Sequence, residues 1–344
     1  MKRRRMIINI HQHLVRLAKL AIVENFRERQ LRGENPDPPD LGDEAIQQTL
    51  ATVLGLMAAR RIDLAGASPR AKAMATHDGT AEQNEIWADL NNGLVLRAAQ
   101  LNKGTFAPIG MLGQHPSVPA EKCAKQLVKW VEQGFIGFNF DPDGTGARWQ
   151  GQPFTGRQWY PVFEAAEAMD VPLVIHASES CNDNFPHTAV HYLVGDTVGV
   201  VLPMVFASQL FKDFPRLRFV IPHGGGPLAC QDGRFEALAA FNKKQGWANP
   251  HQLMEQGNLL VDSCMYKKRN MRALFDAIAA DFILFGDESD GAFPEVINPE
   301  TGDHYDNTKL YIDALEISED DRDKVFEKNA RRVYPKIEQW ITVT

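Results

Sequence analysis

The chain has 344 residues, of which 44% are hydrophobic and 24% are charged, as in ordinary globular proteins. A net charge of −7 gives no electrostatic reason to expect a nucleic acid or an anionic membrane surface as a partner. No uninterrupted apolar run reaches the roughly 18 residues that a transmembrane helix needs.

Short apolar segments recur along the chain, and most of them precede a segment of helical period. They are apolar throughout rather than alternating, which is typical of parallel strands covered on both faces. The predicted strands are Met6–His11, Ile62–Pro69, Gly104–Leu112, Gly134–Pro142, Val171–Ser178, Leu217–Gly224, Asn258–Cys264 and Phe282–Ser289. Helical periodicity predicts helices over Glu44–Arg60, Glu121–Gln133, Gln158–Met169 and Asn270–Ala280, and a closing helix over Ile317–Trp340 with Ser318 as its N-cap.

Strands that alternate with helices in this number predict an α/β fold, the (β/α)8 TIM barrel. The alternative is an open doubly wound sheet, but no Gly-x-Gly-x-x-Gly turn follows the first strand. We expect residues 1–344 to form a single domain with two long insertions on the rim, residues 14–43 after strand one and residues 290–306 after strand eight. Such loops shape the substrate site in barrel enzymes, and contacts between subunits are the alternative role for them.

Polar side chains stand at the carboxyl ends of several predicted strands, where barrel enzymes place their catalytic groups. His11 and His13 are two residues apart on the first strand and therefore project from the same face. His176 ends the fifth strand and Glu288 ends the eighth. Three imidazoles and one carboxylate suit Zn²⁺, or Mn²⁺ or Fe²⁺ with a larger coordination number, and leave a position for water. For any one isolated histidine, a satisfied core histidine is the alternative.

Further candidates lie near these strand ends. His223, in a Pro-His-Gly-Gly-Gly turn, is a fifth ligand, a general acid or base, an oxyanion donor, or only a helix-capping histidine. Tyr192 is a candidate proton donor, although periodicity alone does not establish this role. Arg70 and Arg234 are candidate clamps for substrate carboxylates, with surface salt bridges as the alternative, and Asn139 at the end of strand four is a further candidate substrate-binding residue.

The strand-end motifs resemble those of the amidohydrolase superfamily, in the branch that contains aminocarboxymuconate semialdehyde decarboxylase. The likeness runs from the first strand to the last helix. It is carried by the segments Ile10–His13, Pro172–His176, Phe214–Gly226, Ile283–Glu288 and Asn329–Pro335. Within this branch the chain is most similar to the 4-oxalomesaconate hydratases, in the segments Ser68–Met74, Gly134–Gly137, Val261–Tyr266 and Asp306–Leu315.

The resemblance implies one zinc ion and assigns roles to the strand-end residues. The implied ligands are His11, His13, His176 and Glu288. In the resemblance His223 matches the sixth-strand histidine of the family, and Tyr192 matches the tyrosine that acts on the substrate in the hydratases. A glutamate at the last ligand position favours the hydratases, because the wider branch more often has aspartate there.

The chain also departs from the family pattern at three places. Asn9 stands where relatives commonly have aspartate, and Asp287 stands where they usually have serine. The strand-four turn Asn139–Asp143 differs from the Asn-Leu-Asn-Pro-Asp form of the relatives.

The resemblance, together with these residues, implies a metal-dependent hydratase, a carbon–oxygen lyase of aromatic-compound degradation. It would add water to the C=C bond of an unsaturated oxo-di- or tricarboxylic acid similar to 4-oxalomesaconate. Bound zinc lowers the pKa of water, Glu288 or His223 assists as the base, and Tyr192 or His223 protonates the neighbouring carbon. The alternatives are a metal-dependent decarboxylase of the same branch, a lactone or amide hydrolase, and a non-catalytic barrel whose histidines are merely packed.

The cysteines and the N-terminal residues indicate the cellular compartment in which we expect the protein. Four cysteines lie far apart without a Cys-x-x-Cys pair, which fits reduced thiols in a cytosolic protein. The basic cluster at residues 2–5 is interpreted as a solvated N-terminus rather than a targeting arm, because no apolar segment of a secretory signal follows it. We expect a cytoplasmic homo-oligomer that acts on a small polycarboxylate and binds neither nucleic acid nor membrane.

Overall fold

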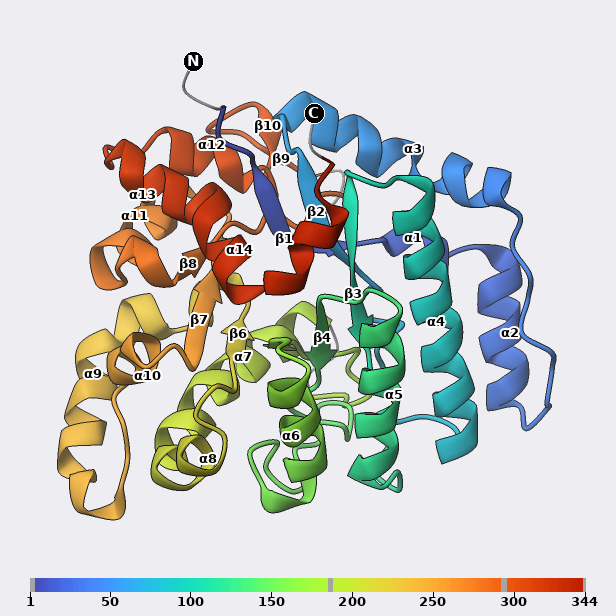
Figure 1. The fold of residues 1–344 in the computed structure, drawn as a ribbon, viewed down its shortest axis with the longest axis horizontal. Coiled ribbons are helices and arrows are strands. Elements are labelled where there is room, and N and C mark those ends of the chain that lie inside the picture. Colours follow the sequence, from blue (N-terminus) through green and yellow to red (C-terminus); the bar gives the residue numbers. More distant parts are fainter. Residues whose placement is uncertain (1–3, 185–187, 292–295, 343–344) are drawn as a thin grey trace.

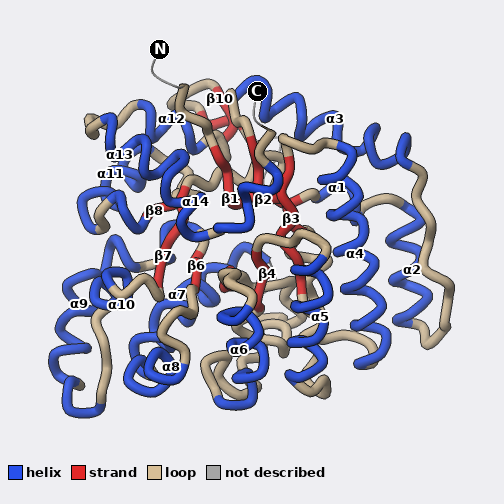
Figure 2. Tube along the Cα trace, in the orientation of Figure 1, coloured by secondary structure: helices blue, strands red, loops and turns tan. Residues whose placement is uncertain are grey.

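The computed structural model describes residues 4–184, 188–291 and 296–342. Its centre is a sheet in which eight parallel strands follow one another in chain order, with the helices around them (Figure 2). The strands are β1 Ile8–His13, β2 Leu64–Ser68, β3 Phe106–Met111, β4 Gly137–Phe140, β5 Leu173–Ile175, β6 Phe219–Ile221, β7 Leu259–Asp262 and β8 Ile283–Leu284. The prediction of a (β/α)8 TIM barrel is confirmed. The predicted strands two to eight each contain one of these strands, whereas β1 starts two residues later than predicted and continues two residues further, to His13.

The first and last strands meet without a regular ladder. Two backbone hydrogen bonds join them, from Ile10 N to Phe285 O and from Glu288 N to His11 O, both 2.9 Å long. On its other side β1 pairs with β2, and its register shifts between Asn9 and Gln12. Such a bulge re-aims side chains, and here it lies beside the two histidines of β1.

The helices form the outer layer of the barrel (Figure 1). The predicted helices over residues 44–60, 121–133, 158–169 and 270–280 appear as α3, α5, α6 and α11. The described helices are α1 Val15–Ala18, α2 Ala21–Leu31, α3 Asp43–Arg60, α4 Ala81–Leu101, α5 Ala120–Glu132, α6 Tyr160–Ala168, α7 Thr188–Val205, α8 Ala207–Asp213, α9 Leu228–Phe241, α10 Pro250–Glu255, α11 Lys268–Ala277, α12 Thr308–Asp313, α13 Glu319–Asp323 and α14 Asn329–Val333. α5 shows why such segments are helical, since its apolar positions at helical spacing, Cys123, Leu127, Trp130 and Val131, are all buried.

The closing helix is shorter than predicted. Ser318 caps α13 as expected, because its hydroxyl accepts a hydrogen bond from Asp321 N at 3.0 Å. A π-helical turn, Lys324–Lys328, then leads into α14. The α-helix ends at Val333 because Pro335 has no N–H to donate and forces Tyr334 out of the helical region, so that a 3-10 segment follows.

The two predicted insertions are structured and touch each other. Residues 14–43 contain α1 and α2, and the second insertion contains a small hairpin of β9 Ile297–Asn298 and β10 Asp303–His304. Residues 292–295 of the second insertion lie outside the described residues. Arg16 of α1 donates two hydrogen bonds, of 2.6 and 2.9 Å, to the carboxylate of Asp290. The loops after β1 and β8 are therefore tied together on the rim.

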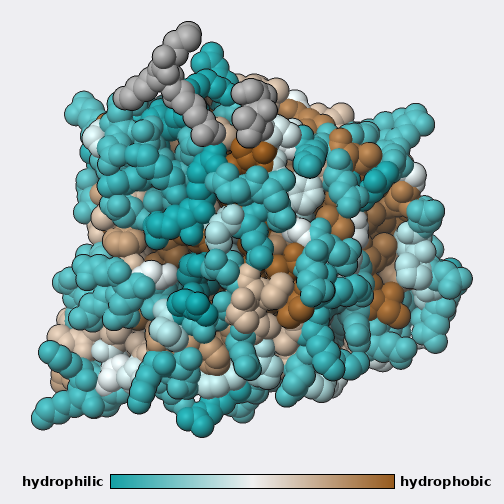
Figure 3. Space-filling view, in the orientation of Figure 1, coloured by the Kyte–Doolittle hydropathy of each residue, from teal (hydrophilic) through white to brown (hydrophobic). Residues whose placement is uncertain are grey.

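Buried side chains fill the space between the strands and the helices. All residues of the eight barrel strands are buried, and Phe106, Phe138, Phe219 and Phe285 are among the largest fully buried side chains. Most of the face in Figure 3 is hydrophilic, with apolar side chains visible in grooves between the helices. Among the described residues no single helix is long and apolar enough to cross a membrane, and one bent pair, Val190–Val205 with Ala207–Asp213, passes only the test of length and composition.

Candidate active site

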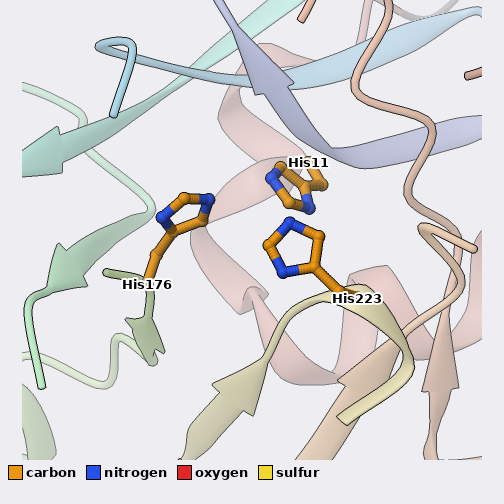
Figure 4. Close-up of side chains that lie close together, drawn as sticks. All are labelled: His11, His176 and His223. Carbon is orange, nitrogen blue, oxygen red and sulfur yellow. The ribbon is translucent and has the colours of Figure 1, made fainter. Parts of the chain in front are cut away.

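Three histidines from different parts of the chain converge at the carboxyl ends of the strands. His11 and His13 belong to β1, and His176 directly follows β5; all three are buried. The Nε2 atom of His13 lies 3.2 Å from Nε2 of His11 and 3.3 Å from Nε2 of His176. In Figure 4 the rings of His11, His176 and His223 face a common centre.

The other nitrogen of each ring fixes its tautomer. Nδ1 of His11 lies 2.7 Å from the Asp262 carboxylate, Nδ1 of His13 lies 2.8 Å from Pro69 O, and Nδ1 of His176 lies 2.7 Å from Ala177 O. Because these partners are acceptors, each Nδ1 carries the proton and each Nε2 presents a lone pair to the centre. Lone pairs facing one another need a cation between them.

The spacing and charge state of the rings fit a divalent metal ion. Ligand nitrogens around a tetrahedral Zn²⁺ stand about 3.3 Å apart, given a bond length of about 2.05 Å, close to the separations observed here. Burial, with His11 nearby, lowers the pKa of His13 to about 4. Burial also lowers the pKa of His176 well below its ordinary value, so both rings are neutral ligands at pH 7.

Glu288 completes the ligand set from the turn after β8. Its ligand oxygen lies within 4.8 Å of the ligand nitrogens of His11 and His13. Burial alone would raise the pKa of Glu288, but the neighbouring histidines and a hydrogen bond from Tyr266 lower it below its ordinary value. Tyr266 donates that bond to Oε2 at 2.9 Å, which fixes one oxygen of the carboxylate. The side chains predicted as ligands therefore meet, and three nitrogens and one oxygen fit a catalytic metal site.

His223 lies beside this centre with a carboxylate behind it. Its Nδ1 is 3.0 Å from Oδ2 of Asp196 in α7, and its Nε2 side faces His11 and His176, with ligand atoms of these three histidines within 4.8 Å of one another. Burial alone would lower the pKa of His223, but Asp196 outweighs burial and raises it to about 9. His223 is therefore a protonated ring that can donate toward the centre.

Tyr192 packs against the same group. Its ring is nearly parallel to that of His223, with centroids 5.5 Å apart, and edge-on to His176 at 4.9 Å. Burial and nearby carboxylates raise the pKa of Tyr192 well above its ordinary value, so the phenol keeps its proton. The centre thus has two proton donors on one wall.

Family comparison agrees with this geometry. The family model described as Amidohydrolase matches residues 8–336. The chain belongs to the amidohydrolase family. It is 38% identical over 340 residues to 2-keto-4-carboxy-3-hexenedioate hydratase from Sphingobium sp., with 97% of each chain covered.

Solved structures extend the comparison. 4-Oxalomesaconate hydratase from Rhodopseudomonas palustris superimposes with a TM-score of 0.85 at 34% identity, covering 97% of each chain. The 5-carboxyvanillate decarboxylase of Novosphingobium aromaticivorans, whose structure holds manganese, has a TM-score of 0.70 at 17% identity over 96% of this chain and 97% of that chain. The latter likeness concerns the fold alone.

The turn that carries Glu288 in this amidohydrolase is held from behind by a buried polar network. Glu288 and Asp290 have positive φ angles of 50° and 60°, a conformation that side chains other than glycine rarely adopt. Arg60 of α3 binds the carboxylates of Asp287 at 3.1 Å and Asp306 at 2.6 Å. The strained turn is therefore stabilised by ion pairs that lie out of contact with water.

The predicted substrate-binding residues differ in their positions. Arg70 follows Pro69, whose carbonyl holds His13, and its partly buried guanidinium lies 3.6 Å from Glu24. Asn139 is buried on β4 and donates to Gly110 O at 3.2 Å. Arg234 is exposed on α9, where its Nε donates to Gln231 Oε1 of the same helix at 3.0 Å. The structure does not bring Arg234 to the histidine cluster.

Three residues that hold the cluster were not predicted as site residues. Asp262 ends β7, so the rule that polar residues at strand ends are functional could have found it. Tyr266 lies four residues further along the chain, within a segment that carries the family resemblance. Asp196 lies inside α7, and its neighbours in the sequence give no signal that it would face His223.

Proposed function

We propose that this amidohydrolase is a metal-dependent hydratase, a carbon–oxygen lyase. It adds water to the C=C bond of an unsaturated oxo-di- or tricarboxylic acid similar to 4-oxalomesaconate, in the degradation of aromatic compounds. The full-length similarity to a hydratase supports the reaction class. The observation that carries the mechanism is geometric: the Glu288 carboxylate and the His223 imidazole, which Asp196 contacts at 3.0 Å, present their ligand atoms within 4.8 Å of each other at one centre.

We propose zinc as the metal, held by His11, His13, His176 and Glu288. Imidazoles and a carboxylate are ligands that catalytic zinc uses, and manganese or iron suits the same residues with added oxygen ligands. When bound, the ion supplies a Lewis acid that lowers the pKa of water and polarises an oxygen of the substrate.

The chain's own residues supply the proton transfers. Glu288, ionised because of its lowered pKa, accepts a proton from the water that adds to one alkene carbon. His223, protonated because of Asp196, donates a proton from Nε2 to the neighbouring carbon. The Tyr192 phenol donates a hydrogen bond to the oxo oxygen as charge develops on it. One water is consumed, and one hydroxyl and one hydrogen are added.

Substrate binding in this proposal uses positive charge and amide groups near the centre. Arg70 is the proposed clamp for one carboxylate and Asn139 a contact at the barrel mouth. Arg234, on the outer surface of α9, takes no part in the proposed site.

The proposal extends to the state of the protein in the cell. We propose a cytoplasmic homo-oligomer made of one domain per chain. The cysteines Cys123, Cys181, Cys230 and Cys264 are free thiols, as is usual in a reducing compartment. Leu193 and Phe241, with 65% and 85% of their surfaces exposed, offer apolar area that a second copy can cover. Light scattering behind size exclusion tests this point, and a monomeric mass would overturn it.

The reaction is tested by following the ultraviolet absorbance of the conjugated oxo-acid. Zinc-loaded protein is expected to decrease this absorbance and to incorporate oxygen from isotopically labelled water into the product. The Glu288→Gln variant is the inactive control. Persistent absorbance would overturn the hydratase proposal for that substrate. Release of carbon dioxide without oxygen incorporation would assign the protein to the decarboxylases instead.

A further inference from the structure

A separate cavity of about 280 Å³ lies between α2, the segment after β2 and α4. Its wall includes Arg27, Arg70, Lys72, Trp87 and Glu179. One wall residue, Arg70, follows Pro69, whose carbonyl oxygen lies 2.8 Å from Nδ1 of His13 in the candidate active site. Its volume is several times the roughly 30 Å³ that one water occupies, so it has room for a group of several heavy atoms.

Arg27 lines this cavity and forms no direct ion pair with any residue that the structure describes. Its guanidinium stacks over the Trp87 ring at 5.2 Å. It donates only to uncharged acceptors, namely Gln30 Oε1 at 3.3 Å, Asp78 O at 3.2 Å and Asn84 Oδ1 at 2.8 Å. Three of the five N–H groups of a guanidinium are thereby used, and two remain for another acceptor.

Three of the acidic residues around the cavity have a cationic partner other than Arg27: Glu24 with Arg70 at 3.6 Å, Glu28 with Arg32 at 3.8 Å and Glu179 with Lys72 at 3.4 Å. The fourth, Asp78, lies 3.6 Å from His77, and its carboxylate also acts on Arg27 without forming an ion pair with it. Within the described ranges, Arg27 has no ion pair of its own. Burial lowers the pKa of Arg27 to about 10, and the Asp78 carboxylate only partly opposes this shift.

Arg70 adds a second unsatisfied donor. Its Nε is buried and, in the part of the chain that the structure describes, has no hydrogen-bond partner. Buried donors without partners are rare in native proteins, and many of them bind a ligand, an ion or an ordered water. Two guanidinium groups with open donor positions thus line one cavity, an arrangement suited to a carboxylate.

We propose that this cavity binds a carboxylate group of a small polycarboxylic acid, with Arg27 as its anchor. The acid is the substrate itself, whose carboxylate furthest from the metal would enter the cavity past Arg70; this assignment of the acid rests on the proposed function. A separate polycarboxylate would present the same chemistry, and the experiment distinguishes the two sources. Trp87 positions the Arg27 guanidinium by stacking rather than by neutralising it.

The test uses metal-loaded full-length protein and two probes, the tricarboxylate trans-aconitate and the dicarboxylate mesaconate, in isothermal titration calorimetry. Arg27→Gln is expected to weaken aconitate binding by about 10- to 100-fold, the range for losing a charged hydrogen bond, and to weaken mesaconate binding less. The matched control is Arg29→Gln on the same helix, because Arg29 pairs with Glu34 outside the cavity. Unchanged aconitate affinity in folded Arg27→Gln would overturn the proposal.

Steady-state kinetics identify the source of the carboxylate. If the cavity binds the substrate carboxylate that lies furthest from the metal, Arg27→Gln raises KM by about 10- to 100-fold, as for aconitate binding, and leaves kcat within about twofold of the wild-type value. A raised aconitate Kd with unchanged KM would overturn the substrate assignment and leave a separate acid as the ligand. Should Arg27→Gln fold poorly, Arg27→Lys keeps the charge and is expected to show a smaller loss of affinity. Failure of wild-type protein to hydrate the oxo-acid would count against the proposed function alone, since the calorimetry does not depend on turnover.

Discussion

The side-chain amide of Asn9 donates a hydrogen bond of 2.8 Å to the Asp287 carboxylate, directly behind the ligand residues His11 and Glu288. The resemblance led us to expect aspartate at position 9 and serine at position 287. Asparagine suits this contact, because an aspartate at position 9 would face the Asp287 carboxylate. Arg60, 3.1 Å from Asp287, supplies the compensating positive charge.

Asn9→Asp is predicted to destabilise the protein, because it places a second carboxylate against Asp287 in a buried site. The expected loss is about 3–5 kcal/mol in the free energy of unfolding, the range for an uncompensated buried charge. Asn9→Asp combined with Asp287→Ser is expected to recover part of this loss, with a coupling energy of about 0.5–3 kcal/mol. Urea unfolding of the two single variants and the double variant measures the coupling, and strictly additive losses would contradict the pairing.

His176→Ala is predicted to abolish retention of the metal, because it removes one of three converging Nε2 lone pairs. Loss of residues that merely support a ligand lowers metal affinity about 10- to 100-fold, so removing a ligand should cost at least about 100-fold. Elemental analysis after chelation and reconstitution checks this. His115→Ala is the matched control, since His115 lies outside the cluster and its Nδ1 is 2.7 Å from Ser117 Oγ. Equal metal content in both variants would argue against the site.

Tyr266→Phe is predicted to lower kcat by about 10- to 100-fold while changing KM little, as for other residues that orient a metal ligand. The lost hydroxyl donates to Glu288 Oε2 at 2.9 Å, so the carboxylate would rotate more freely between metal and water. Tyr160→Phe serves as the control, because Tyr160 binds Asp213 on the outer layer. A change confined to KM would assign Tyr266 to substrate binding.

The activity is predicted to fall as pH rises past about 9. The pKa of His223 is raised to about 9 by Asp196, so the imidazolium is present at neutral pH and loses its proton above that value. Asp196→Asn removes the charge that stabilises the imidazolium, and the alkaline limb of kcat/KM should then move to lower pH. The pH–rate profiles of both proteins give the result, and an alkaline limb that does not move would remove His223 as the proton donor.

The strand-end residues could be predicted because the geometry of parallel strands is regular. Side chains two residues apart share a face, and parallel strands bring their carboxyl ends to one edge, so His11, His13, His176 and Glu288 follow from local sequence. Asp196 reaches His223 from the middle of α7, and the tilt of α7 over the barrel is determined by packing. The structure leaves Arg234 exposed on α9, and the direction of its side chain likewise depends on how α9 is rotated.

The ends of the helices also show which features can be predicted from local sequence and which depend on the fold. Ser318 was correctly predicted as a cap because capping is a local interaction. Pro335 is also a local signal that the last helix ends early, but the helical spacing of the apolar residues led to the longer prediction. The contact between Asn9 and Asp287 spans most of the chain, and only the closed barrel brings these residues together.

The seam between the first and last strands carries the ligand residues on its two sides. His11 lies on β1, Glu288 follows β8, and only two backbone hydrogen bonds join these strands there. A bound ion would therefore link β1 to the turn after β8, where no regular ladder joins the strands, and its binding free energy would stabilise the closed barrel. Removing the ion with a chelator should then loosen the contact between β1 and β8 before the rest of the molecule, and amide exchange should rise first at Ile10 and Glu288.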